Sequence, residues 1–392
     1  MDPRKNPYAP GAGAPPPELA GRDQILEDAR IALDRIRGGL AAKSAILIGL
    51  RGVGKTVLLN RMRVHAEADK HFALWMEAPE DRSLPGILAP ALRTALLRLN
   101  RLYGAAEGAK RALRALAGFI SAMKLKFGDV EASLELESEP GLADTGDLEV
   151  DLADLLEAVG LAAQERNTAF VLFIDELQYV PEAQFAALIT ALHRCAQRQL
   201  PVTLIGAGLP QIVGLSGRAK SYAERLFAFV PIDALSPEAA RAALESPAQK
   251  LNVAYEPAAL EEILRRTERY PYFLQEWGKH AWAAAQSSPI TRGDVDMASQ
   301  NAIDELDASF FRVRFDRLTP TEKRYLRAMA ELGSGPHRSG DIAEKLGKQV
   351  NAFGPVRAGL IAKGMIYSPN HGDTAFTVPL FDGFLKRTLP FH

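Results

Sequence analysis

The sequence has a single cysteine, Cys195, among its 392 residues. One thiol excludes an internal disulfide and a zinc site built from cysteines, and we expect Cys195 to be a buried apolar residue rather than a nucleophile. Long hydrophobic runs are also lacking, because Ala45–Leu50 and Ala169–Ile174 fall far short of the roughly 20 residues that span a bilayer. No apolar run follows the charged N-terminus, so a secretory signal is not expected. These absences predict a soluble cytoplasmic protein without membrane contact.

Neither sign of charge is in excess, since 47 Lys and Arg residues stand against 48 Asp and Glu residues. With 47% hydrophobic residues, the chain is too apolar to be mainly disordered. Its charge is unevenly distributed, because residues 311–392 hold 13 basic and 7 acidic residues. A basic C-terminal module suggests a polyanion as its partner, and a merely solvated basic face has the same composition.

The apolar pattern divides the chain into segments of different character. Prolines and glycines dominate residues 1–20, which predicts an extended, partly disordered arm. Across residues 21–232, strand-sized apolar runs alternate with helical periodicity, which favours an α/β core with a parallel sheet between helices. An alternating segment at 124–136 predicts a hairpin inserted into this core, and residues 233–301 are helical throughout. The expected strands lie at 44–50, 72–78, 169–174, 202–206 and 226–232.

The strongest motif is a glycine-rich loop between the first expected strand and the helix after it. Gly49-Leu50-Arg51-Gly52-Val53-Gly54-Lys55-Thr56 matches the pattern G-x-x-x-x-G-K-[ST]. Glycines allow the backbone N–H groups to point at phosphate oxygens, and the following helix adds its positive N-terminal end. Lys55 is expected to reach the β- and γ-phosphates, and Thr56 to bind Mg²⁺. We therefore predict a nucleotide site that uses Gly49, Arg51, Gly52, Val53, Gly54, Lys55, Thr56 and Val57.

A second motif supplies carboxylates to the same edge of the sheet. The apolar run Phe170–Ile174 ends in Asp175 and Glu176, and ligands bind at the carboxyl ends of the strands in open α/β sheets. We expect Asp175 to bind Mg²⁺ and Glu176 to orient and deprotonate the attacking water. Gln178 and Tyr179 follow closely and are secondary candidates for a role in the site.

With these motifs, the chain resembles the AAA+ group of P-loop ATPases, in the bacterial and archaeal branch close to the origin-recognition and initiator type. Leu19–Asp23 and Tyr270–Leu274 support the resemblance. It implies an αβα core, a helical lid at 233–301 and ATP bound between them. It also implies that Pro271 lies near the adenine, although Arg269 stands where the related motif has glycine.

The resemblance further implies an arginine finger, often supplied to a neighbouring subunit, and Arg225 is the first candidate over Arg218. A finger of this kind predicts a homo-oligomer that ATP promotes. Two departures from the family favour slow hydrolysis and a switch. The strand end at Gly206-Ala207-Gly208 lacks a polar sensor, with only Thr203 nearby, and no spacing selects one of the lid residues Arg265, Arg266 and Arg269.

Residues 311–392 fit a winged helix-turn-helix domain. Thr319–Leu332 and Arg338–Gly347 would be its first two helices, Val350–Lys363 the recognition helix, and Ile366–Val378 the wing. Because of Gly354-Pro355, the recognition helix could begin at Gly354. Double-stranded DNA is the expected partner, and a protein is the alternative. The side chains available to DNA would be Gln349, Asn351, Arg357 and Lys363.

Together these features predict an ATPase that couples Mg-ATP binding to a change of conformation or to assembly on DNA. Two alternatives remain. The first is a signalling switch that holds ATP and docks a protein through its winged helix. The second is a DNA-binding regulator whose nucleotide does not turn over.

Overall fold

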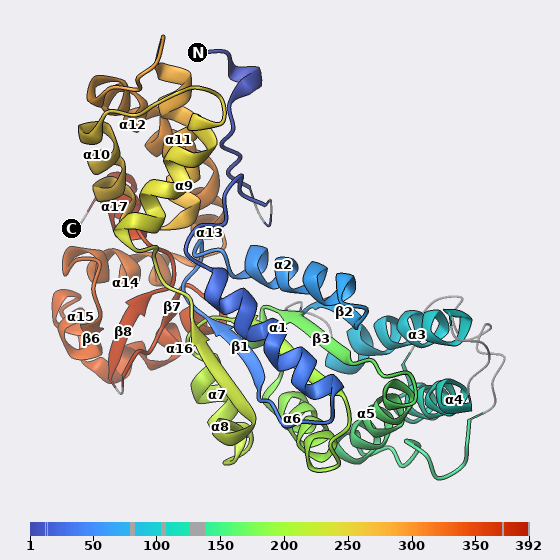
Figure 1. Cartoon of the computed structure of the whole chain (residues 1–392). Coiled ribbons are helices and arrows are strands. Elements are labelled where there is room, and N and C mark those ends of the chain that lie inside the picture. The colour runs from blue at the N-terminus through green and yellow to red at the C-terminus, as the bar shows by residue number, and fades with distance from the viewer. Residues whose placement is uncertain are drawn as a thin grey trace.

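The computed structural model in Figure 1 describes most of the chain. The described residues are 1–11, 13, 15–78, 83–102, 107–125, 138–370 and 372–390. Of the hairpin predicted at 124–136, all but the first two residues lie outside this set. Within it, no helix is long and apolar enough to cross a membrane.

A five-stranded parallel sheet forms the centre of the N-terminal half, with the strand order β2-β3-β4-β1-β5. The predicted α/β class is therefore confirmed. Because all strands are parallel, their carboxyl ends meet at one edge, which holds the loops after β1 and β3 with the end of β4 between them. The strands are β1 (Ser44–Ile48), β2 (Phe72–Glu77), β3 (Phe170–Asp175), β4 (Val202–Gly208) and β5 (Phe227–Pro231).

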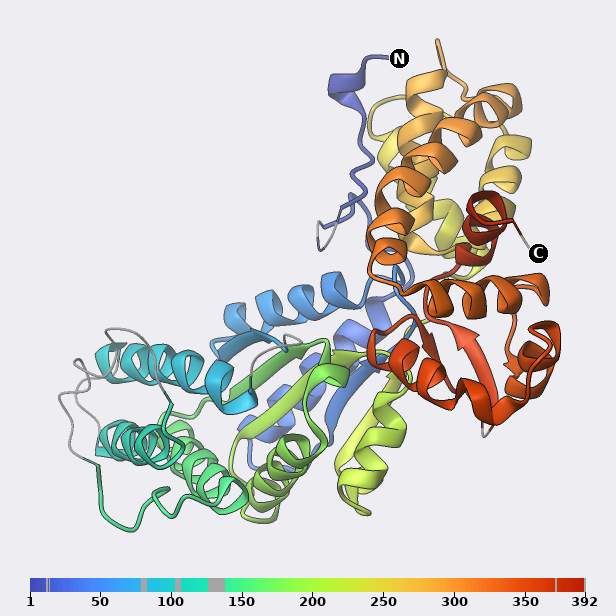
Figure 2. The same cartoon turned by 180° about the vertical axis from the view of Figure 1, so that it is seen from behind.

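Helices cover both faces of this sheet, because its central strands are apolar on both sides. Val171 and Phe173 of β3 pack with α1 (Asp23–Arg37) and α2 (Lys55–Ala68). Leu172 and Ile174 face the opposite layer, which contains α5, α6 and α7. In Figures 1 and 2, α3 and α4 project from the sheet on the side away from the C-terminal module. The remaining helices of this half are α3 (Leu84–Leu102), α4 (Glu107–Ala122), α5 (Leu148–Gln164), α6 (Glu182–Gln197), α7 (Ile212–Ala219) and α8 (Ala223–Leu226). Cys195 is fully buried in α6.

Four helices fill the segment predicted to be a lid: α9 (Pro237–Gln249), α10 (Pro257–Thr267), α11 (Pro271–Ala284) and α12 (Arg292–Leu306). Ser236 caps α9 by accepting a hydrogen bond from the backbone N–H of Ala239. A π-helical segment, Asp307–Phe311, continues α12 into the short α13 (Arg312–Asp316).

The C-terminal module combines four helices with a small sheet of order β6-β8-β7. A 3-10 turn precedes α16, which begins at Gly354, because Pro355 lacks an N–H and fits only the first turn of a helix. The lid and this module share one hydrophobic core, in which Phe311 packs against Phe381 and Phe384. The elements are α14 (Pro320–Glu331), β6 (His337–Arg338), α15 (Ser339–Lys345), α16 (Gly354–Ala362), β7 (Ile366–Tyr367), β8 (Asp373–Phe376) and α17 (Phe381–Thr388).

The start of the N-terminal arm has no regular structure beyond a 3-10 turn at Pro3–Lys5, as expected for an extended segment, but residues 1–8 are packed against the lid rather than disordered. Tyr8 is only 4% exposed and donates a hydrogen bond to the carbonyl of Leu244 in α9. A Cβ at Gly278 would lie 2.7 Å from the Tyr8 ring, so glycine leaves room for it. Trp282 donates to the carbonyl of Asp2 at 3.1 Å. One aromatic anchor thus attaches a proline-rich segment to the lid.

Candidate nucleotide site

The phosphate-binding loop, residues 49–56, joins β1 to α2 at the carboxyl edge of the sheet. Gly54 has φ +89° at the start of α2, a conformation that favours glycine. Gly49 is needed for space, because a Cβ there would lie 2.1 Å from the carbonyl oxygen of Ile232. Gly54 is therefore favoured by its backbone conformation and Gly49 by the close approach of the loop to the neighbouring backbone.

Lys55, the first residue of α2, is folded back onto this loop. Its ammonium group donates to the carbonyls of Gly49 and Leu50, both at 2.9 Å. Burial lowers the pKa of Lys55 to about 8. A buried cation that has only neutral carbonyl acceptors is suited to exchange them for an anion.

Thr56 and Asp175 meet at the end of β3. The Thr56 hydroxyl donates to a carboxylate oxygen of Asp175 at 2.6 Å, and the other oxygen accepts from the N–H of Glu176 at 2.8 Å. Asp175 is 3% exposed, and burial raises the pKa of its carboxyl group. A hydroxyl beside a carboxylate is an oxygen donor pair of the kind Mg²⁺ prefers, so these residues fit the expected ion.

Glu176 directly follows β3, with φ +54°. Its carboxylate is 3.5 Å from the guanidinium of Arg51 and accepts a hydrogen bond from the amide of Gln178. Arg51 in turn donates to the Tyr179 hydroxyl at 2.9 Å, and Gln178 accepts from the N–H of Leu209 at 3.0 Å. Both secondary candidates from the sequence therefore contact the residues around Glu176.

Two segments that are distant in sequence contact the phosphate-binding loop. The sequence patterns did not predict these contacts. Tyr272 at the start of α11 donates its backbone N–H to the Gly52 carbonyl at 3.1 Å. The backbone N–H of Arg51 donates to the carbonyl of Thr377 in the C-terminal module at 2.9 Å. Only the segment Tyr270–Leu274 had a sequence signal, as part of the family resemblance. The phosphate-binding loop is thus in contact with both the lid and the C-terminal module.

Pro271 is the first residue of α11 and precedes Tyr272, so it lies close to the loop. Arg22 donates to the carbonyl of Asp233 and connects the start of α1 to the start of the lid. The proposed contact of Pro271 with adenine stays a prediction.

Arg225 lies at the other edge of the sheet. It is in α8, directly before β5, whose first residue, Phe227, pairs with Ser44 at the start of β1. The amino ends of parallel strands are opposite the phosphate-binding loop. Arg225 can therefore serve as an arginine finger only toward a second copy of the chain.

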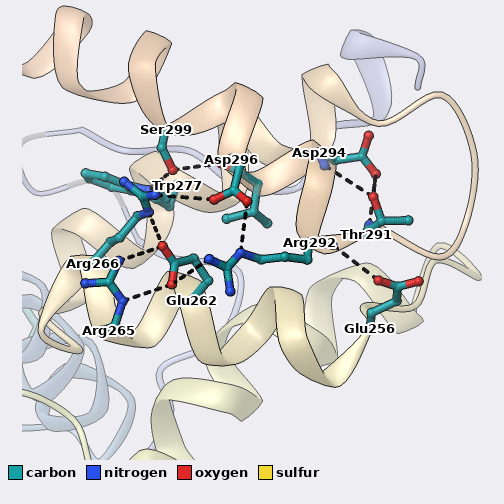
Figure 3. Close-up of polar contacts among 11 residues, drawn as sticks. Glu256, Glu262, Arg265, Arg266, Trp277, Thr291, Arg292, Asp294, Asp296 and Ser299 are labelled. Atoms are coloured by element: carbon teal, nitrogen blue, oxygen red, sulfur yellow. Dashed lines mark hydrogen bonds and ion pairs between the residues drawn. The ribbon is translucent and has the colours of Figure 1, made fainter.

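Arg265 and Arg266 belong to an ionic cluster within the lid (Figure 3). Both pair with Glu262, at 2.7 Å and 2.6 Å, and Arg292 approaches the same carboxylate at 3.3 Å. Hydrogen bonds from Arg265 and Arg266 lower the pKa of Glu262 to about 2. Thr203 lies near the start of β4, where its hydroxyl is 3.1 Å from that of Ser44. Arg265, Arg266 and Thr203 are therefore bonded to residues outside the phosphate-binding loop.

The expectation that Arg357 and Lys363 are available to DNA is wrong in this conformation. Arg357 donates to Thr374 at 3.0 Å and to Ser368 at 2.6 Å, which braces β8 against the segment after β7. Lys363 donates to Glu322 at 2.7 Å. The exposed residues of α16 are Gly354, Pro355, Ala358 and Ala362, which offer no side-chain hydrogen-bond donors. Gln349 and Asn351 are exposed, as expected.

Comparison with protein families gives two matches. Residues 18–205 match the AAA ATPase domain, and residues 308–385 match a domain of unknown function. A search of curated proteins returns no significant match.

Similar solved structures include a Walker-type ATPase of Pyrococcus abyssi, with 17% identity and a TM-score of 0.58 over 94% of this chain and 96% of that chain. The Aeropyrum pernix Orc1 protein, solved in complex with DNA, has 16% identity and a TM-score of 0.48 over 95% and 94%. The Thermotoga maritima RuvB Holliday junction branch migration motor has 16% identity and a TM-score of 0.45 over 95% and 97%. At these identities the likeness to the first structure shows the fold alone. The domain match covers residues 18–205, and within that stretch the structure places the phosphate-binding loop at the carboxyl edge of a parallel sheet.

Proposed function

We propose that the protein binds ATP with Mg²⁺ and hydrolyses it slowly, using the nucleotide to switch the arrangement of its lid and C-terminal module. The observation that carries this proposal is the meeting of Lys55, Thr56, Asp175 and Glu176 at one edge of the sheet. Their types and order match what phosphoryl transfer from a bound nucleotide requires.

Each residue has a role that follows from its present contacts. Lys55 exchanges the carbonyls of Gly49 and Leu50 for phosphate oxygens, with a gain because the new hydrogen bonds are charge-assisted. Thr56 and Asp175 hold the cation with their oxygen atoms, and the ion supplies neutralisation of phosphate charge. Glu176 orients a water molecule and accepts its proton.

Slow turnover follows from the contacts of Glu176 and from the residues at the end of β4. Glu176 is paired with Arg51 and bonded to Gln178, and these contacts must loosen before it accepts a proton. The end of β4 offers glycine and alanine instead of a polar side chain for the γ-phosphate. A site that binds tightly and reacts slowly suits a switch.

The switch would act through two backbone contacts. Thr377 and Tyr272 each hydrogen-bond to the phosphate-binding loop, from the C-terminal module and the lid respectively. A change in loop conformation on nucleotide binding therefore alters both contacts at once.

Isothermal titration calorimetry with ATP and Mg²⁺, followed by a phosphate-release assay, tests this proposal. The unaltered protein should bind ATP, and Lys55→Ala should bind at least about tenfold more weakly because a charged hydrogen-bond donor is lost. Lys43→Ala is a control, because Lys43 is a lysine just before β1 that bonds the carbonyl of Glu224. Absence of ATP binding by folded protein would refute the proposal.

Double-stranded DNA is the partner that we propose for residues 311–392, through phosphate contacts rather than base contacts. Arg338, Lys345 and Lys348 are exposed around α15, and they join Gln349 and Asn351 on the surface. Phosphate contacts suit these cations, because α16 exposes no side chains that could bond to bases. Docking of a protein on this module is the second candidate, favoured by the small, uncharged residues that α16 exposes.

A further inference from the structure

A cavity of about 290 Å³ lies between the ATPase core and the C-terminal module. Arg51 and Glu176 line it from the nucleotide site, and Arg314 lines it from α13. α13 follows the lid and precedes the C-terminal module. A residue on this connection can therefore respond to the nucleotide and to the module together.

Aromatic contacts fix Arg314 beside the phosphate-binding loop. Its guanidinium lies over the ring of Phe310, 4.1 Å from the centroid, and donates to the Phe310 carbonyl. Phe310 stacks on Tyr272 with centroids 4.6 Å apart, and Tyr272 donates its backbone N–H to Gly52. Arg314 is thus connected to the loop by three successive contacts, each of which restricts its position.

The charge in this cavity is not balanced. Arg314 forms no ion pair with any carboxylate in the described part of the chain, and burial lowers the pKa of its guanidinium to about 10, with a further contribution from Arg51. Glu77 and Glu176 are the acidic residues of the cavity wall, and Glu176 is already paired with Arg51 at 3.5 Å. Lys363, another cation of the cavity wall, is neutralised by Glu322 at 2.7 Å. The cavity wall thus carries three arginines, Arg51, Arg314 and Arg317, against the two carboxylates of Glu77 and Glu176. An anion would stabilise this excess of positive charge.

The position of Glu176 indicates which anion fits. The group that activates the attacking water must lie next to the terminal phosphate, so the cavity that Glu176 lines adjoins that phosphate. We propose that Arg314 binds the terminal phosphate of ATP held in the same chain. This inference rests on the proposed function and adds a residue to it. ATP would hold α13 against the core, ADP would not, and the C-terminal module would respond to the difference.

The test compares the affinities of full-length protein for Mg-ADP and for Mg²⁺ with a non-hydrolysable ATP analogue, both by calorimetry. Arg314→Ala should weaken binding of the analogue about 10- to 100-fold, the range for loss of a charged hydrogen bond, and leave ADP binding within about twofold. Arg314→Lys should recover part of the loss. Arg312→Ala is the matched control, because Arg312 is exposed on the same helix and lies over the ring of Phe315. It should change neither affinity.

Equal weakening of both nucleotides by Arg314→Ala would mean that Arg314 only supports the fold, and would overturn the inference. Unchanged affinity for the analogue would overturn it as well. In both cases, normal ATP binding by the unaltered protein would leave the proposed function intact. Failure of the unaltered, folded protein to bind either nucleotide would overturn both.

Discussion

The ammonium of Lys55 donates a 2.9 Å hydrogen bond to the carbonyl of Gly49, the first residue of its own loop. The lysine thus occupies the centre of the loop that is expected to bind phosphate. Burial favours its neutral form and lowers its pKa to about 8. The charge needed for phosphate binding is therefore sensitive to pH in a mildly alkaline range.

Affinity for ATP should fall as the pH rises through about 8, because the neutral lysine attracts phosphate less. Bound phosphate favours the charged form, so binding near this pH should take up a proton. Calorimetry in two buffers with different ionisation enthalpies measures that uptake. Equal binding enthalpies in both buffers would contradict the prediction. The Lys55→Ala variant should show no uptake from this group.

Glu176→Gln should bind ATP with nearly unchanged affinity and lose hydrolysis by about 10²–10⁴-fold, since glutamine cannot accept the proton of water. A phosphate-release assay at saturating ATP measures the loss. Glu182→Gln is a matched control, because Glu182 is exposed at the start of α6 and pairs with Arg218. If Glu176→Gln hydrolyses ATP at the original rate, Glu176 is not the base.

Arg225→Ala should bind ATP but hydrolyse it more slowly, because the finger it removes acts on a neighbouring copy. A mixture of Arg225→Ala and Glu176→Gln chains should recover part of the activity, since one chain keeps Glu176 and the other keeps Arg225. Light scattering should show larger particles with a non-hydrolysable ATP analogue. A mixture as inactive as its components, or one monomer mass in every condition, would exclude a finger in trans.

Tyr8→Ala should destabilise the lid by about 3 kcal/mol, because it removes a buried aromatic ring and leaves a cavity. Urea unfolding followed by tryptophan fluorescence suits this test, as Trp277 and Trp282 are buried in the same core. Tyr8→Phe should cost about 1 kcal/mol, since only the hydroxyl is lost. Arg4→Ala, on an exposed residue of the same arm, should have little effect. Similar stability of Tyr8→Ala and the unaltered protein would mean that the arm is detached in solution.

Replacing Arg338, Lys345 and Lys348 by glutamate should weaken binding to a fluorescently labelled DNA duplex, measured by anisotropy. If each residue contacts one phosphate, the slope of log affinity against log salt should decrease by about 2.7. Arg357→Ala should change affinity through the fold of β8 alone, so its salt slope should stay near that of the unaltered protein. No binding to the duplex at low salt would favour a protein as the partner.

The motif residues could be identified from sequence because their geometry is local. Lys55 and Thr56 start the helix after β1, and Asp175 ends β3, so a strand, a loop and a helix suffice to place them. The glycines of the loop follow from the same short stretch. β4 pairs with both β1 and β3, so the parallel sheet places the two strand ends at the same edge.

The same reasoning failed where a partner is distant in sequence. Proline content made residues 1–20 look partly disordered, but the Tyr8 ring packs beside Gly278 in the lid. The availability of residues in the expected recognition helix was inferred from their side-chain type alone. In the structure, Arg357 and Lys363 hydrogen-bond to other residues of the C-terminal module. Side-chain type shows what a residue can bind, and packing decides whether it is free to do so.

The sequence by itself determined the α/β core, the phosphate-binding loop and the paired carboxylates, because short-range periodicity and spacing set them. Only the tertiary structure decided that Thr377, Tyr272 and Arg314 lie around that loop. Their positions depend on a hydrophobic core shared by the lid and the C-terminal module. The burial that holds such a core together is non-directional, so no local pattern specifies which residues it brings to the site.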